Sequence, residues 1–186
     1  MAGDQKKAET EERTLVWIDE AAFYLLPAVV RTYAPIGQPP VLHAPLSYEH
    51  MSAISAITPD GQLLLHLQEQ AYHGPDVVRF LKHVVRHIPG KLLIMWDGAS
   101  IHGSQPIKDF LAAGAAERIH LERLPGYAPD LNPDEGRWGY LKDGELKNVV
   151  CHNQDKLRSE IRLATARLRH KRHVIKGCIT QAGLEL

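Results

Sequence analysis

Short apolar runs along the chain predict buried strands. Leu15–Ile18 and Lys91–Trp96 are brief, rich in aromatic or branched side chains, and each ends at an aspartate. Runs of this length favour strands over helices, which need more residues to form. Ile119–Leu124 has the same character and predicts a further strand.

A β-hairpin is predicted between Met51 and Leu67. Two apolar stretches, Met51–Ile57 and Gln62–Leu67, flank the sequence Thr58-Pro59-Asp60-Gly61. Proline presets φ, and Asp-Gly supplies the positive φ of a tight turn. The turn therefore brings the two stretches together as antiparallel strands.

Helical spacing of apolar residues predicts four helices. The last has the stripe Leu157, Ile161, Ala164 and Leu168, with steps of four, three and four residues. The segment before the hairpin is rich in proline and predicts a long irregular connection. The predicted helices span residues 74–88, 107–113, 133–141 and 154–173.

The order of these elements predicts a single mixed α/β sheet flanked by helices. We expect a flexible leader over residues 1–13 and the main domain over residues 14–150. A basic helix and tail over residues 151–186 should pack on the same domain.

Composition places the chain among ordinary globular proteins. Hydrophobic residues make up 44% and charged residues 24% of its 186 residues. No apolar run is long enough for a membrane span or a signal peptide, so we expect no membrane partner and a cytoplasmic location. The two cysteines are too few for a disulfide framework.

Charge is balanced overall but unevenly distributed. Residues 1–155 contain 14 Lys/Arg and 20 Asp/Glu, a net charge of −6. Residues 156–176 contain eight basic residues and one acidic residue. The basic segment suits contacts with phosphates, or it is simply the solvated face of a helix.

Three acidic residues stand where strands and a helix could bring them together. Asp19 follows the first predicted strand, Asp97 follows the fourth, and Glu135 lies in the first turn of a helix after the fifth. If the first and fourth strands are parallel neighbours, the three carboxylates meet at one sheet edge. Such a cluster needs a cation, and oxygen ligands favour Mg²⁺ or Mn²⁺ over zinc. Solvated or helix-capping carboxylates are the alternative interpretation.

Three motifs carry a resemblance to a known family. Trp17–Glu20, Trp96–His102 and Leu124–Trp138 resemble the DDE transposases of the Tc/mariner superfamily, and most closely its bacterial branch, the six-thirty family of insertion sequences. The third motif, Tyr-Ala-Pro-Asp-Leu-Asn-Pro-Asp-Glu followed by Trp138, is the most specific. Thirty-seven residues separate Asp97 from Glu135, as is typical of these enzymes.

The resemblance implies a ribonuclease H-like fold with strand order three-two-one-four-five. It assigns the catalytic and metal-binding triad to Asp19, Asp97 and Glu135, with two Mg²⁺ ions per site, for which Mn²⁺ can substitute. It implies metal-dependent cleavage of transposon ends and strand transfer into target DNA. Two positions depart from the family: Gly98 where Asn is common, and Asp134 where Ile is usual. Glu135 matches the family's motif position, so we assign it rather than Asp134.

The resemblance also implies partners. Full-length relatives have an N-terminal helix-turn-helix region that reads transposon ends, so we expect such a region to be encoded upstream, the chain being a fragment or a frameshift product. A homodimer is expected on paired DNA ends. The alternatives are a catalytically idle DNA-binding remnant or regulator of a transposon, and a ribonuclease H-like nuclease with another role.

Further residues are candidates for DNA contact or for support of the site. His102 is five residues beyond Asp97 and could order a ligand or contact a phosphate, or be an ordinary loop histidine. Tyr127 and Trp138 flank Glu135 and could wall the site, stack on a base or pack in the core. The full set is His102, Tyr127, Asn132, Trp138, Arg158, Arg162, Arg169, Lys171 and Arg172.

Overall fold

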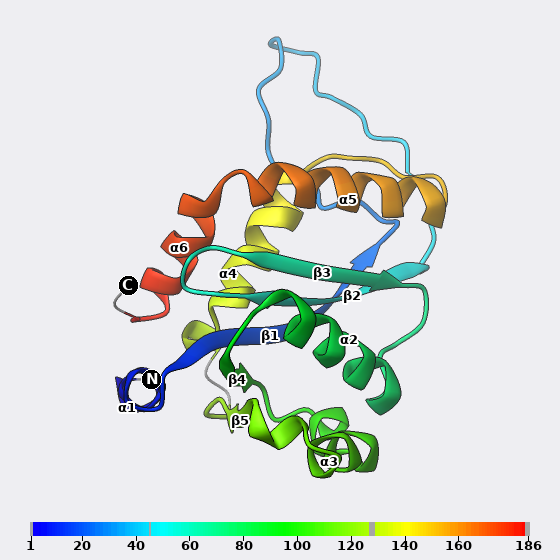
Figure 1. The fold of residues 1–186 in the computed structure, drawn as a ribbon. Helices are drawn as coiled ribbons and strands as arrows, with labels where there is room; N and C mark the ends of the chain where they lie inside the picture. The colour runs from blue at the N-terminus through cyan, green and yellow to red at the C-terminus, as the bar shows by residue number, and fades with distance from the viewer. Residues whose placement is uncertain (1, 45, 127–128, 185–186) are drawn as a thin grey trace.

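One mixed five-stranded sheet forms the centre of the molecule. The computed structural model describes residues 2–44, 46–126 and 129–184 (Figure 1). The strand order is β3-β2-β1-β4-β5, with β1 antiparallel to β2 and parallel to β4, and β4 parallel to β5. This is the order that the family resemblance implies. The strands are β1 (Arg13–Tyr24), β2 (His50–Ile57), β3 (Leu63–Gln68), β4 (Lys91–Trp96) and β5 (Ile119–Arg123).

Helices cover both faces of the sheet (Figure 1). One apolar core lies between the sheet and the α2–α3 side, and a second lies between the sheet and the α4–α6 side. The helices are α1 (Ala2–Thr10), α2 (Gly74–His87), α3 (Gln105–Ala112), α4 (Pro133–Gly139), α5 (Gln154–Arg169) and α6 (Arg172–Gln181). Short 3₁₀ turns occupy η1 (Ser100–Gly103), η2 (Ala115–Glu117) and η3 (Pro129–Leu131), and η4 (Tyr140–Glu145) is a π-helical segment after α4.

Side chains of the central strand alternate between the two cores. Trp17 belongs to the core on the α4–α6 side, and Ile18 belongs to the core on the α2–α3 side. Successive side chains of a strand point to opposite faces. The next two residues, Asp19 and Glu20, therefore leave the strand in opposite directions although they are adjacent in sequence.

The central strand is longer than its apolar run predicts. The sequence places Asp19 after the end of a short strand, whereas β1 continues to Tyr24. The extra residues are held by β2 alone, since Asp19 pairs with Ser55 and Tyr24 with His50, while β4 pairs only as far as Trp17. Asp19 thus lies within β1, beside the point where β4 ends.

The predicted hairpin is confirmed. β2 and β3 pair antiparallel, with Ile57 opposite Leu63 at the turn. Gly61 has a φ of 82°, the left-handed conformation that the turn requires.

The segment between β1 and β2 is irregular, as its prolines predict. No helix or strand lies within its described residues, 25–44 and 46–49, and it extends away from the sheet (Figure 1). It is unusual in its exposed apolar side chains, which are Leu26, Val29, Tyr33, Ile36, Val41, Leu42, Leu46 and Tyr48.

At the N-terminal end, residues 2–10 form α1 within the predicted leader, and Ala8 is buried against the core. The prediction for the C-terminal end is wrong in detail. The predicted last helix is two helices, because the chain bends at His170 and Lys171 and α6 then packs against α4. The stripe Leu157–Leu168 is buried as predicted.

Within the described residues, no helix has the length and apolar character needed to cross a membrane. Cys151 and Cys178 are both buried and free.

Candidate functional site

Two of the predicted acids meet where the parallel strands β1 and β4 diverge. The register pairs Trp17 with Met95, so that Asp19 and Asp97 each lie two residues beyond that pair. Asp97 directly follows the last residue of β4, as predicted. Asp19 is buried, whereas Asp97 is exposed.

Helix α4 brings the third acid to the same place. The Asn132 side chain caps the helix by accepting a hydrogen bond from the Asp134 N–H at 3.1 Å. Glu135 follows in the first turn and is exposed. A cavity of about 350 Å³ is lined by Asp19, Asp97, Asn132 and Glu135 together, so the three acids share one opening.

The neighbouring acid, Asp134, has a different environment. Its side chain is fully buried and accepts a hydrogen bond from Ser55 on β2 at 2.8 Å. It also pairs with the buried guanidinium of Arg137, which in turn donates to Ser55 Oγ at 2.6 Å. Asp134 therefore anchors α4 to the sheet, while Glu135 is left facing the cavity.

Asp19 is electrostatically unfavourable as an anion in the metal-free protein. Burial, and then repulsion from Asp134, Glu135 and Glu20, raise the pKa of Asp19 from 3.8 to about 8. A cation in the cavity would relieve this repulsion and favour the ionised form.

Trp138 joins the core to the site. It is 2% exposed, packs edge-to-face on Phe23 with ring centroids 5.6 Å apart, and belongs to the core. Its indole Nε1 also donates a hydrogen bond to Asp19 Oδ2 at 3.1 Å. Of the roles considered for Trp138, core packing is the one that the structure shows, with a direct bond to Asp19 in addition.

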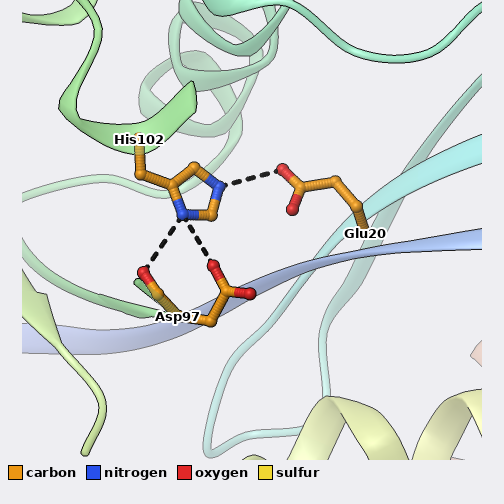
Figure 2. A group of neighbouring side chains, drawn as sticks. All are labelled: Glu20, Asp97 and His102. Atoms are coloured by element: carbon orange, nitrogen blue, oxygen red, sulfur yellow. Dashed lines mark hydrogen bonds and ion pairs between the residues drawn. The ribbon is translucent and has the colours of Figure 1, made fainter. Parts of the chain in front are cut away.

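On the other face of β1, Glu20 contacts His102, which in turn contacts Asp97 (Figure 2). His102 Nε2 lies 3.1 Å from Glu20 Oε1, and Nδ1 lies 3.0 Å from Asp97 Oδ1. Burial lowers the pKa of His102, but the hydrogen bond and charge of Glu20, together with Asp97, outweigh this effect and raise it. Sequence analysis missed Glu20, because the first strand was predicted to end before this residue. Within β1, the alternation of side chains directs Glu20 to the face opposite Asp19.

Arg123 is a second residue that sequence analysis missed. It is the last residue of β5 and lines the cavity. Its guanidinium lies over Gly98, where an added Cβ would stand 1.9 Å from Nη2. Gly98, which departs from the family pattern, thus leaves room for the Arg123 guanidinium beside the carboxylates.

The remaining candidates in the described part of the chain do not line the cavity. Tyr127 lies outside the described residues. Arg158 pairs with Glu69 at 2.7 Å, and Lys171 pairs with Glu145 at 2.7 Å. Lys171 and Arg172 are at the start of α6 instead of on the predicted single helix. Among the described residues that line the cavity, none belongs to the basic set Arg158, Arg162, Arg169, Lys171 and Arg172.

The donor set of the cavity suits a hard divalent cation. Asp19, Asp97 and Glu135 supply carboxylate oxygens, which Mg²⁺ and Mn²⁺ prefer. Burial is the largest cause of the raised pKa of Asp19, and repulsion from neighbouring carboxylates, which a cation would offset, adds to it. The tightest group of ligand atoms in the described part of the chain is a different one, Glu20, Asp97 and His102, whose atoms lie within 4.8 Å of one another.

Comparison with known proteins identifies the family. Residues 14–158, most of the chain, match the family described as DDE superfamily endonuclease. None of the curated proteins matches the chain by sequence.

Solved structures share the fold. The chain is similar to the Mos1 strand transfer complex (TM-score 0.64, 14% identity, 100% of this chain and 61% of that chain). It is also similar to the Mos1 mariner paired end complex with Mn (0.65, 15%, 97% and 60%) and to the catalytic domain of Mos1 mariner transposase (0.59, 12%, 98% and 88%). The chain thus spans about three fifths of the longer Mos1 chains. The predicted ribonuclease H-like fold is confirmed.

Proposed function

The chain belongs to the family of DDE superfamily endonucleases, and from that premise we propose that it is the catalytic domain of a DNA transposase. The observation that carries the proposal is the shared cavity of Asp19, Asp97 and Glu135. These side chains come from β1, the end of β4 and the first turn of α4, so the fold itself assembles them from distant parts of the sequence.

In this proposal Asp19, Asp97 and Glu135 hold two Mg²⁺ ions, or Mn²⁺ in their place. When bound, two such ions supply activation of the attacking oxygen and stabilisation of the leaving oxygen in an in-line phosphoryl transfer. The pair Asp134–Arg137 holds α4 against β2, which keeps Glu135 at the cavity. Trp138 fixes the orientation of the Asp19 carboxylate.

The substrate proposed is DNA, first at transposon ends and then at a target. Arg123, beside the carboxylates, is placed to contact a phosphate, and its charge would offset repulsion between the site and the DNA backbone. The basic residues of α5 and α6, such as Arg162 and Arg172, would bind backbone outside the cavity. Base-specific recognition of the ends is proposed to come from a helix-turn-helix region encoded upstream.

The branch and the organisation of the protein are further parts of the proposal. We place the chain in the bacterial six-thirty branch because of its Leu124–Trp138 motif. We also propose that it acts in the cytoplasm. Residues 14–150 would be the DDE catalytic domain, with residues 151–186 packed on it. The burial of Ile161 and Ile179 in the same core as Trp17 supports that packing.

A homodimer on paired ends is also proposed. Its support is the segment between β1 and β2, where Tyr33 and Ile36 are fully exposed. Exposed apolar side chains that recur along one segment suit contact with a second subunit. Light scattering with and without end DNA would test this part of the proposal.

The experiment for the function as a whole is an assay with DNA that carries the ends of the element. The chain, with its helix-turn-helix partner supplied, should cleave those ends in Mg²⁺ and join them to a target. Cleavage should be lost in Glu135→Gln, while DNA binding is kept. DNA retention without turnover in the unmodified chain would instead indicate an idle remnant or regulator. Cleavage without joining would indicate a nuclease of another role.

A further inference from the structure

The contacts of Asp97 divide its two carboxylate oxygens into one that is held and one that is free. Oδ1 accepts a hydrogen bond from the Ala99 N–H at 2.8 Å and lies 3.0 Å from His102 Nδ1. Within the described residues, no donor bonds to Oδ2, which points away from the imidazole (Figure 2). The side chain is exposed, so without these contacts it would rotate freely.

The imidazole that holds Oδ1 is itself rigidly placed. His102 is 6% exposed and stacks on Trp96, with ring centroids 4.3 Å apart and the rings parallel. Trp96 is the last residue of β4 and immediately precedes Asp97. Nδ1 also lies 3.2 Å from the Asp97 carbonyl oxygen, so His102 contacts both the backbone and the side chain of Asp97.

Glu20 completes the arrangement from the central strand. Its Oε1 lies 3.1 Å from His102 Nε2, on the opposite side of the ring from Asp97. Each ring nitrogen therefore faces a carboxylate oxygen. Asp19 immediately precedes Glu20 on β1. The strand that carries Asp19 therefore also positions Asp97, through Glu20 and His102.

We propose that Glu20 and His102 are positioning residues, which hold Oδ1 of Asp97 so that Oδ2 is presented to a divalent cation. This inference rests on the proposed metal site at Asp19, Asp97 and Glu135. Carboxylates that bind metals are commonly fixed by hydrogen bonds from surrounding groups, and removal of such groups typically weakens metal binding by roughly 10–100-fold.

The same three residues could instead bind a cation directly, since their ligand atoms lie within 4.8 Å of one another. A ring nitrogen that donates a hydrogen bond to a carboxylate has no lone pair for a metal, so the two arrangements exclude each other at His102. The two arrangements also differ in Glu135, which is essential to the first and absent from the second.

The test is Mn²⁺ binding to the whole chain, measured by electron paramagnetic resonance without DNA. His102→Ala should weaken binding by roughly 10-fold or more. His102→Asn, whose amide can donate in the place of Nδ1, should recover much of the loss. Glu20→Gln should also weaken binding, and Glu20→Ala should weaken it no further in the His102→Ala background, because Glu20 reaches Asp97 through His102 and its charge beside Asp19 disfavours the ionised Asp19 carboxylate.

Matched controls separate positioning from stability. Glu145→Gln removes a carboxylate paired with Lys171 and Arg167, and His66→Asn removes an imidazole bonded to Tyr72. Both should leave the Mn²⁺ affinity unchanged, and thermal unfolding of every variant reports the fold. Glu20→Gln retains the size of the side chain, so it tests the proposal even if His102→Ala is unstable.

The outcomes distinguish this inference from the function on which it rests. Unchanged Mn²⁺ affinity in folded Glu20→Gln and His102→Ala, with loss in Asp97→Asn and Glu135→Gln, overturns the positioning role and leaves the proposed site intact. Loss in Glu20→Gln and His102→Ala with no loss in Glu135→Gln identifies direct binding at Glu20, Asp97 and His102 and overturns both. Additive effects of Glu20→Ala and His102→Ala also overturn the positioning role.

Discussion

The indole Nε1 of Trp138 donates to Oδ2 of Asp19 across 3.1 Å and so ties α4 to the central strand. Both residues are buried, and they are 119 positions apart in the sequence. The bond links the helix that carries Glu135 to the strand that carries Asp19, and its energetic value can be measured.

Trp138→Phe removes that donor and keeps an aromatic ring in the core. We expect the free energy of unfolding to fall by about 1–3 kcal/mol, because a buried acceptor loses its partner. The variant should also bind Mn²⁺ less tightly at neutral pH, since the indole bond lowers the pKa of Asp19. Urea unfolding and metal titration provide the two measurements.

Trp17→Phe is the matched control for this change. Trp17 is equally buried in the same core, but its Nε1 has no hydrogen-bond partner among the described residues. The Trp17→Phe substitution should lower the free energy of unfolding through lost packing, and it should leave the Mn²⁺ affinity unchanged. Equal effects of the two substitutions on metal binding would contradict the role given to the Trp138–Asp19 bond.

The raised pKa of Asp19 predicts how metal-free stability depends on pH. Below about pH 4 the folded and unfolded chains both carry this proton. Between pH 4 and 8 the unfolded chain loses it while the folded chain retains it, given the shift from 3.8 to about 8. The free energy of unfolding should therefore fall as pH rises through this window.

Asp19→Asn should abolish that part of the pH dependence. In metal-free buffer near pH 7.5 it should raise the free energy of unfolding by about 2 kcal/mol or more, because the buried group can no longer ionise. Chemical unfolding at pH 5 and pH 7.5 measures the difference. A variant no more stable than the parent at pH 7.5, with the same pH slope, would show that Asp19 is not destabilising.

In the presence of Mg²⁺ or Mn²⁺, the ionised Asp19 carboxylate should stabilise the folded chain instead of destabilising it. A cation that binds the folded chain stabilises it, and it must displace the Asp19 proton. The gain in melting temperature should therefore increase between pH 6 and pH 8 in the parent chain and be absent in Asp19→Asn. A gain that does not vary with pH would speak against Asp19 as a ligand.

The adjacent acids of α4 should differ sharply. Asp134→Asn leaves the buried Arg137 guanidinium without its counter-ion, so we expect a loss of about 3–5 kcal/mol in unfolding free energy. Glu135→Gln alters an exposed side chain, and its effect should be within about 0.5 kcal/mol. Metal binding should respond in the opposite order, with Glu135→Gln the more damaging in protein that remains folded.

Arg123 should contribute to DNA binding. Arg123→Ala is expected to weaken binding of end DNA and to reduce the slope of log affinity against log salt by about 1, as for the loss of one phosphate contact. Gly98→Ala should displace the guanidinium, since its Cβ would collide with Nη2, and should reproduce part of this loss. Arg86→Ala, on the exposed surface of α2, is the control, and a slope reduced equally by that variant would deny Arg123 a specific role.

Much of the fold was predictable because its elements follow simple periods. The hairpin at Gly61, helix α2 and the strand that ends at Trp96 occur where the sequence predicts them. The length of β1 was not predictable, because Ala21 and Ala22 have no strong apolar pattern and are held by pairing with β2. The bend between α5 and α6 has no glycine or proline to mark it and depends on packing against α4.

The candidate site was predicted in part. Asp19, Asp97 and Glu135 were found from their places after strands and in a helix, and their motifs gave the family. Glu20 was missed because its contact with His102 depends on which face of β1 its side chain occupies. Arg123 was missed because its position depends on the space that Gly98 leaves. Neither quantity is visible until the topology is known.

The most direct measurement is the anomalous scattering of Mn²⁺ in crystals of the chain. We expect density at ligand distance from the carboxylates of Asp19, Asp97 and Glu135, within the cavity that they line. Manganese bound by Glu20, Asp97 and His102, with Glu135 making no contact to any ion, would contradict the account.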